Sequence, residues 1–209
     1  MKQHLSTHPR RHFLHLQLAR HALLAELDEG ALAELVELLE MHDTHRGECM
    51  LEQGSRELRQ FFVLEGLLKR IVTSPHGREM TLRFAGEGDF ETCYEAWRRQ
   101  DTVAYSVVCA ASGCVASLPM SEWCSFLARH PQAQQVFHDR VVALGQTLVD
   151  HAVGLLLLDA SARVDAFSRR HPQLIGRLVQ KDLASHLNLS AETLCRLSRR
   201  TEGRVACAG

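Results

Sequence analysis

The stretch QKDLASHLNLSAETLCRLSRR, residues 180–200, predicts two short helices joined by a tight turn. Leu183 and Leu187 fall at helical spacing and form part of the apolar side of the first helix. Asn188 follows at the turn, where a left-handed backbone is common and Asn tolerates it better than most residues. Ser190 is a good N-cap for the second helix. This order of signals is typical of a helix-turn-helix.

The second of these helices has one apolar side and one polar side. Leu194 and Leu197 are expected to face the core, which leaves a polar outward face made of Glu192, Thr193, Cys195, Arg196, Arg199 and Arg200. Such a face matches the geometry with which a recognition helix reads bases in the major groove of DNA. A surface helical hairpin with a basic face is the alternative interpretation.

Charge is unevenly distributed along the 209 residues. The net charge of the whole chain is −1, but residues 161–204 carry nine Lys/Arg against four Asp/Glu, a local net charge of +5. The remainder is therefore acidic, near −6. A basic C-terminal part on an acidic body suits phosphate contact by one end of the molecule. The length is enough for a buried core and one to two domains.

Cysteine and histidine usage bears on compartment and metals. The chain has seven Cys and none forms a CxxC pair. We find no secretory signal and expect no apolar run long enough to cross a bilayer, so we predict reduced thiols in a cytoplasmic protein. The spacing of His4, His8, His12 and His15 would let them share a helical face, but solvation is the simpler interpretation. No metal site is predicted.

The texture of the sequence changes twice along the chain. Residues 1–45 are expected to be helical, with Asp28 and Gly30 breaking the pattern. Short apolar runs punctuated by Gly from about 46 to 119 indicate a β-barrel or jelly roll. Residues 75–77, Pro-His-Gly, form the expected hairpin tip between strands at 67–72 and 79–84.

Helical texture returns after residue 119. A short helix opens near Ser121 and stops at His130-Pro131, and Asp159 caps a further helix that ends near Arg170. Between them an a/d seam predicts a dimerisation helix at 132–158, although a helix packed on its own barrel would show a similar pattern. The seam consists of Phe137, Val141, Leu144, Leu148, Ala152 and Leu155.

This order of parts resembles the Crp/Fnr family of bacterial transcription regulators over nearly the whole chain. The pieces that carry the resemblance are Gly47-Glu48, Glu52-Gln53-Gly54, FFVLEGLLKR (61–70), GREMTLRF (77–84), GEGDF (86–90), ASLPMSEW (116–123), LLLLDASARVDAF (155–167) and LASHLNLSAETLCRL (183–197). The resemblance implies an α+β chain with a jelly-roll sensor domain at 1–131, a dimerisation helix at 132–158 and a winged-helix-like DNA-binding domain at 159–209.

The resemblance also assigns roles in DNA binding. Glu192 and Arg196 would read bases, since Glu can accept from a cytosine amine and Arg can contact guanine O6 and N7. Cys195 stands where related proteins often carry Ser, and Arg199 and Arg200 would add to the phosphate field. The backbone contacts would come from Gln180, Lys181, Ser190 and Thr193. The expected target is a palindrome of TGA half-sites on double-stranded DNA, bound by a homodimer. An activator of this kind would also contact RNA polymerase, although no motif identifies such a surface.

The effector region departs from the cyclic-nucleotide-binding members of the family. Thr92-Cys93 stands in place of Gly-Glu, and Thr102-Val103 stands in place of Arg followed by Ser or Thr. A buried phosphate without a cationic partner is costly, so these replacements argue against cAMP or cGMP, with Arg98 and Arg99 as the available substitutes. The absence of Cys before Cys49 argues against an iron–sulfur cluster of the oxygen-sensing kind.

The identity of the effector stays open. Cys93 and Tyr94 lie close to where haem-containing carbon monoxide sensors of this family place a ligand, so haem and thiol redox chemistry are both candidates. A Cys that packs as a small apolar residue is the simpler alternative. No nucleophile–base pair or phosphate-binding loop is evident, so an enzyme is not expected.

The C-terminus also departs from the family pattern. Only residues 201–209 follow the recognition helix, where family members carry a β-hairpin wing. We therefore expect a truncated wing. The competing hypothesis is a sensor module with degenerate DNA binding.

Overall fold

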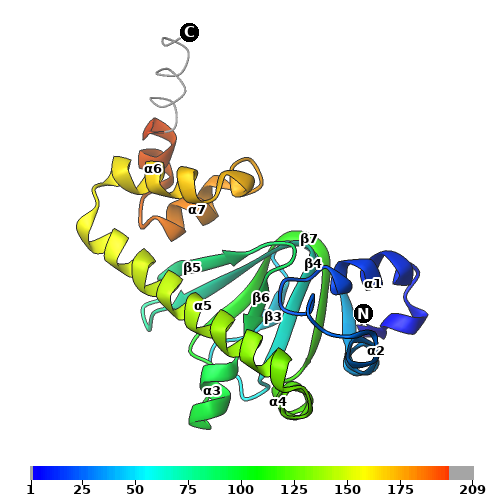
Figure 1. Cartoon of the computed structure of the whole chain (residues 1–209). Helices are drawn as coiled ribbons and strands as arrows, with labels where there is room; N and C mark the ends of the chain where they lie inside the picture. Colours follow the sequence, from blue (N-terminus) through cyan, green and yellow to red (C-terminus); the bar gives the residue numbers. More distant parts are fainter. Residues whose placement is uncertain (1, 198–209) are drawn as a thin grey trace.

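The computed structural model describes residues 2–197 and combines an antiparallel sheet with a long helix and a C-terminal group of helices (Figure 1). The strands are β1 (Lys2–His4), β2 (Glu40–Thr44), β3 (Cys49–Leu51), β4 (Arg59–Thr73), β5 (Glu79–Ala85), β6 (Phe90–Thr92) and β7 (Ser106–Pro119). The helices are α1 (Arg11–Ala19), α2 (Glu29–Leu38), α3 (Tyr94–Arg99), α4 (Met120–Arg129), α5 (Pro131–Leu157), α6 (Ala160–Arg170) and α7 (Gln180–His186), and 3-10 turns cover Leu5–Thr7 and Pro172–Leu174. The α+β prediction is confirmed.

The sheet is built around the two long strands β4 and β7. The strand order is β1-β2-β7-β4-β5, with β3 also on β7 and β6 also on β4, and every pair is antiparallel. The register shifts where Gly66 in β4 approaches Gly113 in β7. A Cβ on Gly113 would lie 2.1 Å from the carbonyl oxygen of Glu65. Only glycine allows this close crossing, which bends the sheet over its core.

The hairpin between β4 and β5 confirms the turn predicted from Pro75 and Gly77. Gly77 has a left-handed φ of 75° and its amide donates to the Ser74 carbonyl at 2.9 Å. The Ser74 amide in turn donates to the Arg78 carbonyl, which closes the loop. The hairpin brings β5 to the edge of the sheet, where the C-terminal helices pack.

The first 45 residues differ from the all-helical expectation. Two helices are present, and the side chain of Asp28 accepts from the Ala31 amide at 2.7 Å to cap the second of them. Residues Lys2–His4 and Glu40–Thr44, however, form strands β1 and β2. β2 pairs with β7, whose residues lie about 75 positions further along the chain. That long-range pairing overrides the local helical pattern.

One large hydrophobic cluster lies between the sheet and the helices α1, α2, α4 and the first half of α5. Trp123 of α4 is fully buried, and its ring lies 5.4 to 5.5 Å, between centroids, from Phe62 of β4, from Phe126 of α4 and from Phe137 of α5. Aromatic rings at these separations pack favourably beyond the area they bury. This cluster makes the sheet and the start of α5 one body.

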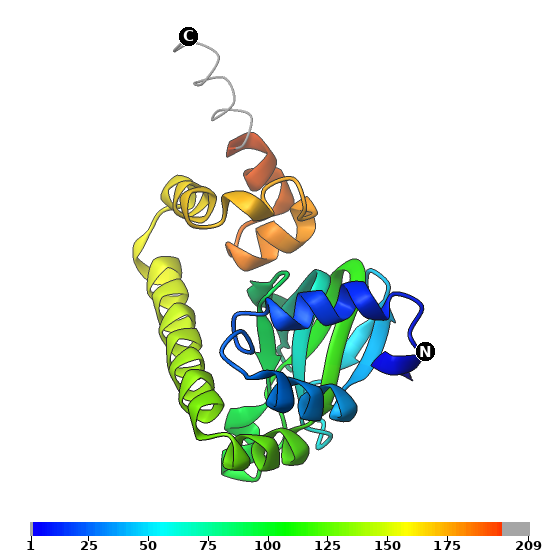
Figure 2. The ribbon, with the colours of Figure 1, turned by 45° about the vertical axis from the view of Figure 1, so that its right-hand side comes forward.

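The helical half of the chain follows the sequence expectation closely. α4 ends at Arg129, α5 begins at Pro131 against a predicted 132, and the side chain of Asp159 caps α6 by accepting from the Ala162 amide at 2.8 Å. Figure 2 shows α5 running along one side of the sheet and carrying the chain to the C-terminal helices at its far end. A second, smaller hydrophobic cluster holds those helices together and includes Leu67 and Ala110 from the sheet.

Candidate nucleic-acid interface

The helix-turn-helix predicted from the sequence has the expected local geometry. Asn188 adopts a left-handed φ of 51° at the end of α7. The Leu189 amide donates to the Ala184 carbonyl at 2.9 Å, and the Asn188 amide donates to the Ser185 carbonyl at 3.2 Å. These two bonds form a Schellman motif, which satisfies the last carbonyls of the helix and turns the chain sharply.

A second helix starts at residue 191 and runs through 197 within the described residues. The side-chain oxygen of Ser190 accepts from the Thr193 amide at 3.1 Å, which is the predicted N-cap contact. Leu194 is buried in the second hydrophobic cluster beside Ala184 and Leu187. The spacing that buries Leu194 therefore turns the polar residues of this helix outward.

The predicted DNA-contacting residues are accessible wherever the structure describes them. Glu192 and Arg196 are exposed and lie four residues apart, hence about one turn apart on the same face. Gln180, Lys181 and Ser190 are exposed as well, and Thr193 and Cys195 are half-buried. Arg199, Arg200 and the predicted wing lie outside the described residues.

α7 is docked against β5 and the neighbouring strand by polar contacts that the sequence did not suggest. Lys69 Nζ lies 2.6 Å from Asp182 Oδ1, and both side chains are mostly buried. The Thr81 amide donates to Ser185 Oγ at 3.0 Å. Arg78 of the β4–β5 hairpin donates to the side-chain oxygen of Asn188 at 2.7 Å. The first helix of the helix-turn-helix is thereby held on the sheet.

A further ion pair fixes the segment that precedes α7. Arg177 donates to both carboxylate oxygens of Glu87 at 2.7 and 2.8 Å and to the Gly66 carbonyl at 3.2 Å. The bidentate geometry and the added carbonyl contact make this a specific clamp rather than a loose surface pair. The C-terminal helices therefore sit on the sheet in one defined orientation.

The pair Lys69 and Arg70 shows how one strand serves both sides of the sheet. Adjacent residues of a strand point to opposite faces, so Lys69 reaches α7 while Arg70 turns inward. Arg70 Nε donates to Glu91 Oε2 at 2.8 Å, and its guanidinium lies 3.9 Å from the centre of the Tyr105 ring. The signal in the sequence is two basic residues inside the otherwise apolar run LLKRIV.

A charged network also lies inside the sheet domain, beside its hydrophobic core. Glu91 is fully buried, and its Oε1 lies 3.4 Å from Arg83 Nε. Arg83 is also paired with Asp89. A buried carboxylate with two guanidinium partners is compensated, whereas either partner alone would be costly. The acidic residues of the GEGDFET segment are therefore ion-pair partners rather than a free acidic cluster.

Cys93 and Tyr94, the residues singled out for an effector, lie beside this network. Cys93 is buried, and burial raises the pKa of its thiol even though the Arg59 backbone acts in the opposite direction. A raised pKa keeps the thiol protonated and disfavours thiolate chemistry. Tyr94 begins α3 and its hydroxyl lies 3.0 Å from His138 Nε2 of α5. Cys93 therefore packs in the core of the sheet domain, and Tyr94 links α3 to α5.

The seam predicted for α5 is divided between two environments. Phe137 is fully buried against the sheet domain, and Val141 and Leu144 are packed on the same cluster. A different face of α5 points away from the sheet. It carries four apolar side chains that are 45 to 83% exposed: Val142, Val149, Val153 and Leu156. These residues are separated by seven, four and three positions, which is a heptad-type stripe. The stripe, not the first half of the predicted seam, is open to a partner helix.

α5 also has the length and composition of a membrane-crossing helix. Its most apolar window has a mean hydropathy of 1.3, and 6% of that window is buried. The sequence expectation that no such segment exists was therefore wrong on these two criteria. The burial of Phe137 ties the start of the helix to the core of the sheet domain, which argues for a helix at a protein surface.

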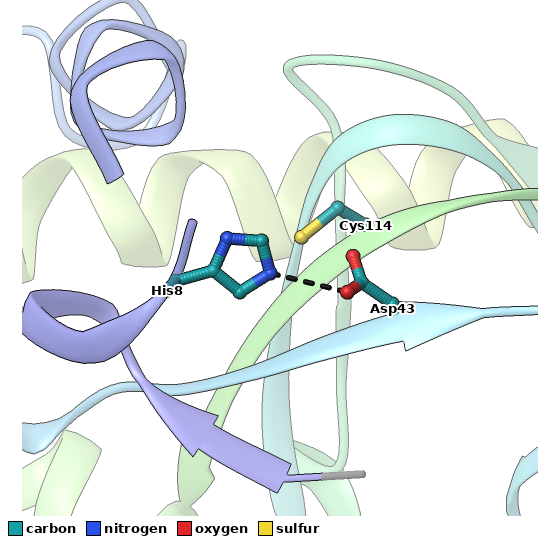
Figure 3. Close-up of side chains that lie close together, drawn as sticks. All are labelled: His8, Asp43 and Cys114. Atoms are coloured by element: carbon teal, nitrogen blue, oxygen red, sulfur yellow. Dashed lines mark hydrogen bonds and ion pairs between the residues drawn. The ribbon is translucent and has the colours of Figure 1, made fainter. Parts of the chain in front are cut away.

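A small cluster of potential metal ligands joins the N-terminal segment to the sheet (Figure 3). His8 Nε2 lies 3.2 Å from Asp43 Oδ2, and Cys114 is beside them. The Arg10 amide donates to His8 Nδ1 at 3.1 Å, so the neutral ring carries its proton on Nε2 and directs it at Asp43. A metal bound through Nε2 would need that proton on Nδ1, where a backbone donor already stands. The cluster is a hydrogen-bonded pair, and burial raises the pKa of the neighbouring Cys114 thiol to about 12.

No protein-family model and no curated protein matches the chain, whereas solved structures do. FixK2 from Bradyrhizobium japonicum superposes with a TM-score of 0.71 and 15% identity over 78% of this chain and 84% of that one. The CooA mutant from Carboxydothermus hydrogenoformans superposes with a TM-score of 0.68 and 12% identity, over 82% of this chain and 79% of that one. CLP from Xanthomonas campestris superposes with a TM-score of 0.66 and 17% identity, over 85% of this chain and 93% of that one. At such identities the likeness concerns the fold, and the chain has the fold of Crp/Fnr-type regulators over most of its length.

Proposed function

We propose that this protein is a homodimeric DNA-binding transcription regulator that reads a palindromic site with the helix beginning at residue 191. The observation that carries the proposal is the pair Glu192 and Arg196, exposed one turn apart on a capped helix that follows a Schellman turn. In the proposed division of the chain, residues 1–131 sense a signal, 132–158 dimerise and 159–209 bind DNA. No catalytic role is proposed.

The roles proposed for the exposed side chains follow from their chemistry. Arg196 would make a bidentate contact with guanine, and Glu192 would accept from a cytosine amine in the neighbouring base pair. Lys181 and Gln180 lie at the start of α7, where they would meet the phosphate backbone. Ser190 and Thr193 would add backbone contacts, and Cys195 would contact a base edge or methyl group.

Dimerisation would use the exposed stripe of α5. A second copy of this helix would cover Val142, Val149, Val153 and Leu156 and remove their apolar side chains from water. Gly145 faces open space on the same helix, so a partner helix could approach there closely. A two-fold dimer would also present two recognition helices to two half-sites.

Control by a signal would act through the contacts that hold α7 on the sheet. The contacts of Lys69, Arg78 and Arg177 set the orientation of the helix-turn-helix, so any ligand that favours or opposes them would shift the population of DNA-competent dimers. The solved structure of CLP is described as that of a c-di-GMP-responsive global regulator. Signal control of this kind is therefore compatible with the fold.

The decisive experiment is fluorescence anisotropy on a palindromic TTGA/TCAA duplex and on a scrambled duplex, at two salt concentrations. A regulator binds the palindrome at least tenfold more tightly, and Arg196→Ala reduces that preference by about 1–3 kcal/mol. Arg99→Gln, which removes an exposed cation of α3, is the matched control and leaves the preference unchanged. Equal, salt-sensitive binding to both duplexes would support instead a sensor module that no longer reads bases.

A further inference from the structure

A cavity of about 820 Å³ lies where the sheet, α5 and the C-terminal helices meet. Its lining comes from all three parts, including Leu82 and Phe84 of β5, Thr147 of α5 and Phe167 of α6. It adjoins the charged network of the sheet domain: Arg83 and Asp89 belong to both, whereas Arg70 and Glu91 do not line the cavity. A cavity of this size is in the range that encloses a small organic ligand.

One face of α5 lines this cavity at regular spacing. The lining positions of α5 include Arg140, Ala143, Thr147 and Gly154. They are three, four and seven residues apart, so they lie on one face of the helix. This face is about 180° away from the exposed stripe around Val149, given 100° per residue. α5 therefore has a cavity on one side and its apolar, unpartnered stripe on the other.

The charge of the cavity is strongly positive. Five arginines and two aspartates line it, and two of the arginines are paired: Arg83 with Asp89 and Arg170 with Asp150. Among residues 2–197, no ion pair involves the other three, Arg140, Arg163 and Arg169. Three cations that face one cavity without carboxylate partners form a site for an anion.

Two polar atoms at the wall lack partners within the described residues. Nε of Arg163 is buried without an acceptor, although Nη1 of the same side chain donates to the Leu187 carbonyl at 2.7 Å. Nε2 of His151 is likewise buried and without a partner. Buried polar atoms are normally hydrogen-bonded, so both atoms are positions where a ligand oxygen would be favourable.

Histidines at the same wall report the positive field. Burial lowers the pKa of His171, and the neighbouring Arg170 and Arg83 lower it further. His151 also has a lowered pKa, first through burial and then through His171 and Arg170 despite the His186 backbone contact. An anion in the cavity would relieve this accumulation of positive charge.

Much of the remaining lining is apolar. Leu82, Phe84 and Phe90 come from the sheet side, and Leu144 and Leu155 come from α5. A simple inorganic anion would leave this surface uncovered. A ligand with an acidic group and an apolar body would satisfy both kinds of lining at once.

We propose that the junction cavity binds an amphipathic organic anion, a carboxylate or sulfonate with an apolar body, and that this ligand links the sheet, α5 and α6. The inference deepens the proposed function, because such a ligand would be the signal that sets the orientation of the helix-turn-helix. Its binding is measured without DNA, so its failure is distinguishable from failure of the DNA-binding proposal.

The test uses the full chain and the fluorescent sulfonate 8-anilinonaphthalene-1-sulfonate as the probe. We expect saturable binding of one probe per chain, displacement by decanoate, and displacement by decanol that is at least tenfold weaker. Decanol has the same apolar body without the charge, so the difference measures the contribution of the arginines.

Two variants locate the binding site. Arg140→Gln with Arg169→Gln changes two exposed, unpaired side chains and is expected to weaken probe binding at least tenfold. Ala143→Trp projects a ring into the cavity and is expected to abolish saturable binding, while Arg129→Gln, which removes an exposed cation of α4 outside the cavity lining, leaves it unchanged. Equal displacement by decanoate and decanol, or unchanged probe affinity in both cavity variants, would overturn the proposal.

Discussion

The two hydrophobic clusters of the molecule differ in how they are held together. The cluster under the sheet contains fully buried large side chains such as Trp123, Phe62 and Phe137 from several elements. The cluster of the C-terminal helices receives only Leu67 and Ala110 as buried residues from the sheet. Phe84 and Ala111 of the sheet are partly buried against it, and the contacts of Lys69, Arg78, Thr81 and Arg177 with the C-terminal helices or Glu87 add a polar part to the docking. The difference indicates one cooperative body and one docked unit whose release costs much less than global unfolding.

Polar docking is suited to a unit that must change its orientation. Each hydrogen bond or ion pair contributes only about 1 kcal/mol net, because water replaces it when the contact opens. A well-packed aromatic core offers no such replacement. If this comparison is correct, substitutions in the two regions must differ both in size and in the observable that they change.

The largest effect is expected in the aromatic core. Trp123→Ala should lower the free energy of unfolding by about 3–5 kcal/mol, because it leaves a cavity between α4, β4 and α5. Urea unfolding at fixed protein concentration measures it. Trp97→Ala in α3 is the matched control, since that side chain is 38% exposed and should cost much less. Similar losses for both tryptophans would contradict the central place given to Trp123 in the cluster under the sheet.

A smaller and more local effect is expected at the docking surface. Lys69→Met leaves the mostly buried Asp182 without its cation and should cost about 1–3 kcal/mol in the docked state. Hydrogen exchange of residues 180–197 should accelerate while exchange in β4 and β7 stays slow. Arg99→Gln also breaks an ion pair, the exposed i,i+4 pair with Glu95, and should change neither the docking free energy nor the exchange of residues 180–197. Uniform acceleration across the chain would mean that the two regions unfold together.

The exposed stripe of α5 provides a third comparison, between a charged and an apolar side chain at one position of the stripe. Val149→Glu places a charge in the stripe and should raise the dimer dissociation constant at least tenfold, about 1.4 kcal/mol. Val149→Leu keeps the stripe apolar and should retain the dimer. Sedimentation velocity at several concentrations measures both. A monomeric parent protein would remove the dimer from the proposed function.

The smallest effect is expected from a change of pH at the interface between the two regions. His186 of α7 donates from Nδ1 to the Thr81 carbonyl at 3.1 Å and stacks on His151, with ring centroids 4.0 Å apart. Burial first, and then His151, lowers the pKa of His186 to about 3. The docked state therefore holds the neutral ring, whereas the released state binds a proton near the ordinary pKa of histidine.

The sign of this effect follows from linkage. Docking is fully favoured above about pH 6.5 and weakens as the pH falls from there toward 3, because only the released unit takes up the proton. Limited proteolysis of the C-terminal unit should accelerate between about pH 7 and 5.5. His12→Gln, at an exposed position of α1, should preserve that pH dependence, and His186→Phe should reduce it. A flat profile in the parent protein would show that His186 does not report docking.

Local rules account for the parts of the fold that could be predicted from the sequence. The left-handed Asn188, the caps at Ser190, Asp159 and Asp28, and the hairpin at Gly77 each depend on residues at most a few positions apart. Their geometry is set by backbone sterics and short-range hydrogen bonds. The α+β character and the outward face of the helix after residue 191 followed from the same rules.

Only the tertiary structure decided which faces and side chains meet. The strand pairing of Glu40–Thr44, the free face of α5 and the contact of Lys69 with Asp182, 113 residues apart, depend on partners that no local spacing identifies. The same holds for the inward Arg70 and for the junction cavity, which is lined by segments from across the chain. The sequence by itself determined where helices and turns begin and end, because those signals are local. The packing of the folded chain determined what each face contacts, because burial and ion pairing join residues that are distant in sequence.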